Sequence, residues 1–238
     1  MEHLLLLHGA LGSAAMLDSL RQSLQDSFTV HTLNFSGHGG TPLPQEPFSM
    51  QLFIQDVLRY LNERQIGSAH IFGYSMGGYA ALSLALQHPE RIKSIYTLAT
   101  KFAWSEAAAE KETKLLNPEK VAEKVPAFAQ TLAQRHFPQD WKTVMRHTAS
   151  MMLQLGKHPL LTSETLAQLQ LPVQVAVGDR DNMVTVEETL WAYRQLPNAR
   201  LQVLPGTRHP FETLSVPELN QQIRQFIGQT AVTSTLIP

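Results

Sequence analysis

A serine flanked by glycines is the feature of the sequence that points most directly to chemistry. Residues 73–77 read Gly-Tyr-Ser-Met-Gly and match G-x-S-x-G, a pattern that places the serine on a sharp turn between a strand and a helix. Side chains at the glycine positions would collide with that strand and helix. An apolar run (residues 69–72) precedes the turn, and an alanine- and leucine-rich segment follows it. The pattern favours Ser75 as a nucleophile over an incidental serine in a glycine turn.

Two later loops contain the acid and the base that such a serine needs. Serine reacts only when a base takes its proton, and an acid must orient that base. The first loop follows an apolar run at residues 173–177 and contains Asp179 and Asp181, while the second follows the run at residues 200–204 and contains His209. Both loops therefore lie at strand carboxyl ends, where an open α/β sheet binds its ligands. Each residue alone is ordinary, but the order serine, acid, histidine indicates a catalytic triad that uses one of the two aspartates.

Backbone N–H groups that could stabilise an oxyanion are expected at two turns. Residues 8–12 read His-Gly-Ala-Leu-Gly and come directly after the apolar run at residues 4–7. The residue after the nucleophile, Met76, should supply the other donor from the positive end of a helix. Because both donors belong to the main chain, the side chains at these positions can vary with little effect on the donors. An ordinary strand-to-helix turn is the alternative interpretation of residues 8–12.

Short apolar runs alternate with helical periodicity, which predicts a mainly parallel sheet covered by helices. The clearest helix begins at Met50, where the apolar residues follow the i, i+3, i+4, i+7 spacing up to Leu61. Ser13 is expected to cap an earlier helix, a last helix should begin near Ser215, and the tail from residue 228 onward should be poorly ordered. Strands are expected at residues 4–7, 28–34, 69–73, 92–99, 173–177 and 200–204.

The alternation is interrupted between residues 102 and 169, where the sequence shows helical segments and no strand pattern. Ser105 and Asn117 are suited to cap helices in this stretch. We interpret it as a helical lid inserted into a single domain that covers residues 1–238. Three residues are candidates for substrate contact, namely Leu11, Tyr74 and Trp104. Four basic side chains would meet an acidic substrate if they faced the site, with a solvated helix face as the ordinary alternative: Lys101, Arg135, His136 and Arg146.

The composition narrows the class of protein. Of 238 residues, 43% are hydrophobic, so the chain can bury a large core. The net charge of −1 gives no electrostatic footprint for nucleic acid or for an anionic membrane. The absence of cysteine excludes disulfides and thiolate chemistry, and residues 1–7 lack the basic segment of a signal peptide. We therefore expect a cytoplasmic monomer or homodimer that acts on a small molecule.

The sequence resembles the α/β-hydrolase family in its compact, lid-bearing esterase form. The resemblance covers about residues 4–227, is weakest across the lid, and rests on motifs at residues 8–10, 36–39, 73–78, 178–181 and 209–210. It implies the three-layer α/β-hydrolase fold with about six strands, because the first strand begins almost at Met1. In this family the acid stands three residues after the loop glycine, which selects Asp181 over Asp179. The resemblance also implies Ala10 and Met76 as the oxyanion donors, and no metal or cofactor. Ser36 departs from the acidic residue that is common at its position.

The resulting hypothesis is a serine esterase that cleaves a carboxylic ester, a thioester or a lactone through an acyl-enzyme. Three alternatives share the fold. A lyase of the menaquinone pathway has the same elbow, but that family has an arginine where this chain has Tyr79. A perhydrolase is suggested by Ser75 and the three residues that follow it. A ligand-sensing protein would retain the triad and bind without normal turnover.

Overall fold

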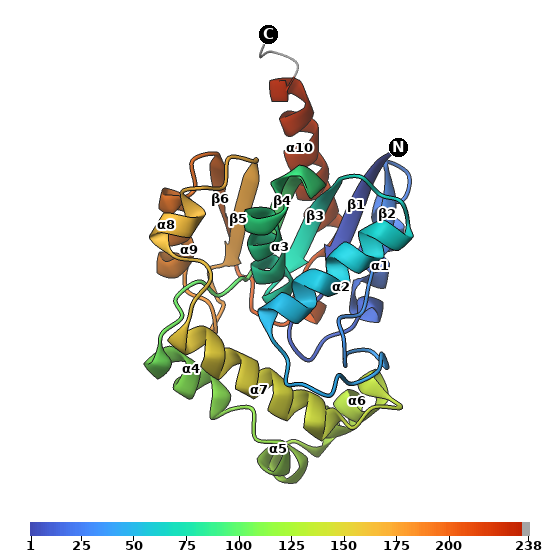
Figure 1. Ribbon diagram of the computed structural model, residues 1–238, viewed down its shortest axis with the longest axis vertical. Coiled ribbons are helices and arrows are strands. Elements are labelled where there is room, and N and C mark those ends of the chain that lie inside the picture. The colour runs from blue at the N-terminus through green and yellow to red at the C-terminus, as the bar shows by residue number, and fades with distance from the viewer. Residues whose placement is uncertain (235–238) are drawn as a thin grey trace.

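The fold is built on a six-stranded parallel sheet, seen in a computed structural model that describes residues 1–234 (Figure 1). The strand order is β2-β1-β3-β4-β5-β6, and every neighbouring pair is parallel. The expected sheet of six parallel strands is confirmed, with boundaries that differ by a residue or two. The strands are β1 (Glu2–Leu7), β2 (Phe28–Thr32), β3 (Ala69–Tyr74), β4 (Ile92–Leu98), β5 (Val173–Gly178) and β6 (Ala199–Leu204).

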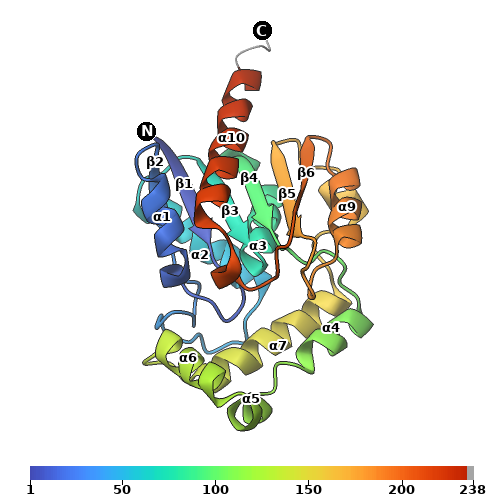
Figure 2. The same ribbon diagram turned by 180° about the vertical axis from the view of Figure 1, so that it is seen from behind.

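Helices cover both faces of the sheet and complete three layers, as Figures 1 and 2 show from opposite sides. One face is covered by α2 (Met50–Glu63), α3 (Met76–Gln87) and α9 (Val186–Gln195), and the other by α1 (Asp18–Leu24) and α10 (Val216–Ser234). Each face has its own buried apolar cluster. Within the described residues, no helix is long and apolar enough to cross a bilayer.

The helix α2 forms as its periodicity predicts. Ser49 accepts a hydrogen bond from the Leu52 N–H and so satisfies one of the free donors of the first turn. The residues Phe53, Ile54 and Val57 on the apolar stripe are fully buried against the sheet. Packing of this stripe, more than intrinsic propensity, stabilises a helix of this length.

Two local predictions were wrong. Ser13 makes no capping bond, because a short 3-10 turn (Ala14–Leu17) follows it, in which the Met16 N–H donates to the Ser13 carbonyl. The tail was expected to lose order from residue 228, yet α10 continues to Ser234. Residues 235–238 of that predicted tail lie outside the described residues.

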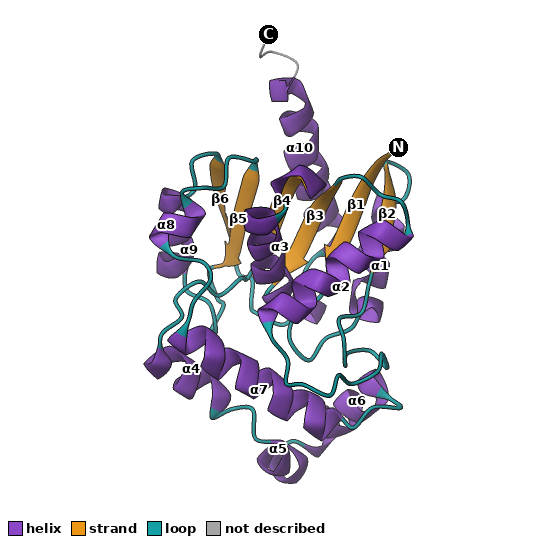
Figure 3. Ribbon diagram, viewed as in Figure 1, coloured by secondary structure: helices purple, strands orange, loops and turns teal. Residues whose placement is uncertain are grey.

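The stretch between β4 and β5 contains helices and no strand, as expected. Four of these helices, which we call the cap, lie across the carboxyl ends of the strands toward which the arrowheads point (Figure 3). Ser105 and Asn117 accept the expected capping bonds, from the N–H groups of Ala108 and Lys120. A fifth helix, α8 (Ser163–Leu166), packs against α9 and does not belong to the cap. The cap consists of α4 (Glu106–Thr113), α5 (Pro118–Lys124), α6 (Pro126–His136) and α7 (Trp141–Lys157).

The crossing of β3 and α3 leaves no room for a side chain at two glycines. A Cβ atom built on Gly73 would lie 2.5 Å from both Cα and N of Gly78, and one built on Gly78 would lie 2.1 Å from the Thr100 Oγ1. Real Cβ atoms do not approach backbone this closely. The glycines therefore allow α3 to start directly beside the end of β3, with a single residue in the turn.

Candidate active site

Ser75 is the residue in that turn, between the last residue of β3 and the first of α3. Its backbone has φ 51° and ψ −116°, a conformation that is strained for a residue with a side chain. Hydrogen bonds hold it there: the Ser75 N–H donates to the Leu98 carbonyl at 2.8 Å, and the Thr100 hydroxyl donates to the Ser75 carbonyl at 3.0 Å. Such strain persists only where the surroundings enforce it, and it is common at functional sites.

His209 and Asp181 meet at the ends of β6 and β5. The Nδ1 atom of His209 lies 2.8 Å from Oδ2 of Asp181, and the Asp181 side chain is only 1% exposed. The other carboxylate oxygen accepts the N–H groups of Met183 and Val184, each at 2.8 Å. Because the carboxylate occupies Nδ1, the proton of a neutral imidazole resides there and Nε2 is left as an acceptor. Asp179, the alternative acid, is exposed and does not make this contact.

Tyr74, a candidate for substrate contact, forms a hydrogen bond with the backbone of His209. Its hydroxyl donates to the His209 carbonyl at 2.6 Å, and its ring packs edge-on against Phe211. Burial raises the pKa of the Tyr74 phenol, so the hydroxyl remains a donor. Tyr74 is not among the residues that line the pocket beside Ser75.

Residues 9–12 form a four-residue turn that we call the oxyanion turn. The Gly9 carbonyl accepts the Gly12 N–H at 3.1 Å and a hydrogen bond from Nδ1 of His8 at 2.8 Å. The Gly9 C=O and the Ala10 N–H belong to one planar trans peptide and point in opposite directions. Fixing the carbonyl therefore fixes the direction of the Ala10 N–H. Leu11, another candidate for substrate contact, has its side chain in the apolar core.

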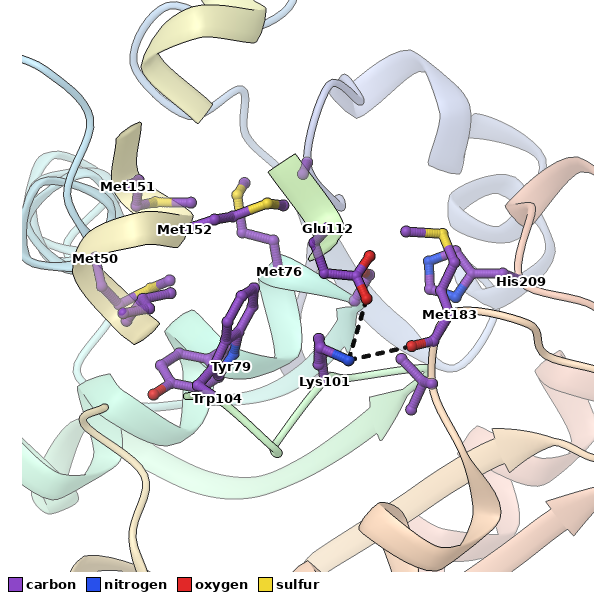
Figure 4. A pocket seen from close by; sticks show the side chains of 14 residues that line it. Met50, Met76, Tyr79, Lys101, Trp104, Glu112, Met151, Met152, Met183 and His209 are labelled. Carbon is purple, nitrogen blue, oxygen red and sulfur yellow. Dashed lines mark hydrogen bonds and ion pairs between the residues drawn. The ribbon is translucent and has the colours of Figure 1, made fainter. Parts of the chain in front are cut away.

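One pocket brings most of these groups together, as Figure 4 shows. Its empty space is about 500 Å³ with the open solvent at its mouth included, and Ser75, His209, Ala10 and Met76 line it. The remaining wall is mainly apolar and includes Trp104, the one substrate-contact candidate that does lie here. Five of the lining residues are methionines, namely Met50, Met76, Met151, Met152 and Met183.

A charged pair interrupts this apolar wall. Lys101 is 3.3 Å from Glu112 on α4, and it also donates to the Met183 carbonyl at 3.3 Å (Figure 4). Lys101 is not on a solvated helix face, since its side chain is only 17% exposed. No local sequence pattern predicts this pair, because Lys101 lies in the loop after β4 and Glu112 lies in the cap. Among residues 1–234, no three His, Asp or Glu side chains form an arrangement suited to a metal ion.

Three buried histidines lie beneath the oxyanion turn and beside it. The ring of His38 is 5.3 Å from that of His8 and 5.6 Å from that of His136. Burial lowers the pKa of His8 and of His136 to about 4, and that of His38 well below its usual value, because the cation loses its hydration. All three rings are therefore neutral at pH 7.

These histidines predict a loss of stability in mild acid. In the unfolded chain a histidine takes up a proton near pH 6.5, whereas in the folded chain His8 and His136 take up theirs only near pH 4. The free energy of unfolding should therefore hold above about pH 6.5 and fall below it, by up to about 1.4 kcal/mol per pH unit for each buried histidine. Urea unfolding of the His136→Gln variant between pH 7 and pH 4.5 should show a shallower fall. The exposed His158, replaced by Gln, is the control and should keep the parental slope, and equal slopes for both variants would contradict the prediction.

Comparison with known proteins agrees with the fold. A family model described as alpha/beta hydrolase fold matches residues 2–162. A pimeloyl-[acyl-carrier protein] methyl ester esterase of Nitrosomonas europaea is 28% identical, over 90% of this chain and 91% of its own. A 2-(acetamidomethylene)succinate hydrolase of Mesorhizobium japonicum is 23% identical, over 94% and 87%. Among solved structures, a putative lipase from Acinetobacter baumannii superposes with a TM-score of 0.83 at 19% identity, covering 98% of this chain and 85% of its own.

Proposed function

This chain belongs to the alpha/beta hydrolase fold family, and we propose that it is a serine hydrolase that cleaves esters of small molecules. The observation that carries the proposal is the 2.8 Å bond between His209 and Asp181, at the edge of the pocket that Ser75 lines. A histidine held in this tautomer is the base that a serine nucleophile requires. The relatives named as esterases and hydrolases support the same class of reaction.

The proposed reaction proceeds in two halves through an acyl-enzyme. Ser75 Oγ attacks the ester carbonyl carbon while His209 Nε2 takes its proton, and the resulting oxyanion is held by the N–H groups of Ala10 and Met76. The tetrahedral intermediate collapses, and His209 returns the proton to the departing alcohol. Water then attacks the acyl group with His209 as base, which releases the acid and regenerates Ser75. Each step uses only side chains and backbone of this chain.

The pocket wall favours an apolar acyl group. Methionine side chains are unbranched and polarisable, so they adapt to chains of different shape. The Lys101–Glu112 pair adds one polar position within this wall (Figure 4). A thioester or a lactone would react by the same steps, whereas nothing in the charge distribution favours nucleic acid or a membrane as a partner.

Tyr79 weighs against the lyase alternative. Its hydroxyl accepts the N–H groups of Leu160 and Leu161, at 2.9 and 3.1 Å, and so holds the segment that returns from the cap. A residue used in this way does not replace the arginine of the menaquinone-pathway family, although a putative 2-succinyl-6-hydroxy-2,4-cyclohexadiene-1-carboxylate synthase of Bacillus subtilis is 22% identical over 87% of this chain. Among the described residues, no structural feature favours the perhydrolase or the ligand sensor over the esterase.

Labelling and turnover test the proposal directly. A fluorophosphonate should modify Ser75 and no other serine, because Ser75 lines an open pocket together with the oriented His209, whereas Ser94, which contacts His70, is buried. The Ser75→Ala variant should lose the label while keeping its unfolding temperature. A series of p-nitrophenyl esters of graded chain length should be hydrolysed with multiple turnovers. Label at another serine would refute the nucleophile, and a single stoichiometric release without turnover would favour the ligand sensor.

Replacing each aspartate in turn tests the orienting acid. In the Asp181→Asn variant the amide can still accept the Met183 and Val184 N–H groups, but it donates to Nδ1 and imposes the wrong tautomer on His209. We expect turnover to fall by roughly 10²–10⁴, in line with the loss for the trypsin-type triad. Asp179→Asn is the matched control and should cost less than about tenfold. Steady-state rates in the reverse order would overturn the assignment of Asp181.

A further inference from the structure

The carbonyl of Leu11, in the oxyanion turn, is held by the cap. It accepts a hydrogen bond from Nη1 of Arg135 at 2.9 Å and another from Nε2 of His136 at 3.2 Å. Both donors stand at the carboxyl end of α6, more than a hundred residues further along the chain. Leu11 itself has φ 55°, in the left-handed region that favours glycine. A leucine stays in this conformation only where its surroundings enforce it.

The two ring nitrogens of His136 have fixed roles. The Gly39 N–H donates to Nδ1 at 3.1 Å, so the proton of the neutral ring must reside on Nε2, where it is donated to Leu11. The side chain is fully buried. His136 therefore connects the cap to two loops that follow neighbouring strands, the oxyanion turn after β1 and the loop after β2.

Arg135 extends the same connection toward the catalytic base. Its Nη2 atom lies 3.5 Å from Glu212, which stands three residues after His209, and its side chain is only 15% exposed. One guanidinium thus contacts the oxyanion turn with one nitrogen and the segment of His209 with another. Neither Arg135 nor His136 lines the pocket beside Ser75.

We propose that Arg135 and His136 are positioning residues through which the cap fixes the oxyanion turn. The inference rests on the proposed function, because it assumes that the Ala10 N–H stabilises an oxyanion. Without its two donors, the Leu11 carbonyl is free to rotate and the strained Leu11 relaxes toward negative φ. The turn that orients the Ala10 N–H then changes shape. Since neither Arg135 nor His136 lines the pocket, the loss should fall on the transition state more than on substrate binding.

Kinetics of four variants test this proposal. Arg135→Met and His136→Phe remove the donors while keeping apolar volume, and each should lower kcat about 10- to 100-fold, less than the full loss of an oxyanion donor. The KM for a p-nitrophenyl ester should stay within about threefold. His136→Gln, which retains a donor and an acceptor, should restore most of kcat. Arg146→Gln is the matched control, because Arg146 pairs with Glu119 inside the cap, and it should keep parental rates.

A second readout separates positioning from a purely structural role. A trifluoromethyl ketone forms a hemiketal with the serine whose oxyanion occupies the same hole as that of the ester. Its inhibition constant should rise across the variants in proportion to the loss of kcat/KM. Unchanged kcat in folded Arg135→Met and His136→Phe, or kcat losses without weaker inhibition, would overturn the inference. If the parent protein itself fails to hydrolyse esters or to label at Ser75, the proposed function fails first, and the two failures are distinguishable.

Discussion

The close crossing of β3 and α3 is the constraint on which the rest of the site depends. It forces Ser75 into a left-handed turn and points the start of α3 at the groups that follow β1. A Cβ atom built on Gly9 would lie 3.2 Å from the Cβ of Ser75, so the oxyanion turn packs closely against Ser75. Met76, the first residue of α3, lines the same pocket as Ala10 and Ser75, and its N–H belongs to the positive end of that helix. The positions of the proposed nucleophile and oxyanion donors therefore depend on backbone packing and not on side-chain choice.

The sheet topology supplies the remaining members of the site. Because all strands are parallel, the loops after β1, β3, β5 and β6 emerge at one edge. The register that pairs Gly178 with Leu204 places the loops of Asp181 and His209 side by side, which accounts for their 2.8 Å bond although they stand 28 positions apart in the sequence. The cap then closes over this edge, and Arg135 and Glu112 connect it to the loops beneath. The fold thus gathers groups that are remote along the chain.

Local chemistry made much of this predictable from the sequence, and tertiary packing explains the rest. The apolar stripe of α2 follows from its periodicity, and the hydrogen bond by which Ser105 begins α4 follows from helix-capping chemistry. Both effects act over a few residues. The capping bond expected of Ser13 is absent because a 3-10 turn follows it, in which the Met16 N–H donates to the Ser13 carbonyl and not to its side chain. Tyr74 was expected in the pocket, but alternation along β3 places it on the face opposite that of Ile71 and against His209. The methionine wall and the charged pair at Lys101 could not be predicted, since their members come from elements that are far apart along the chain.

The central claim is that Ser75 and His209 act as one unit, and a double-mutant comparison tests it most directly. The measurement is kcat for Ser75→Ala, His209→Ala and the double variant on one p-nitrophenyl ester. If the serine depends on the histidine for its reactivity, each single change removes the whole mechanism, and the double variant should be about as slow as either single one. Losses that multiply in the double variant would show that the two residues act independently and would contradict the account.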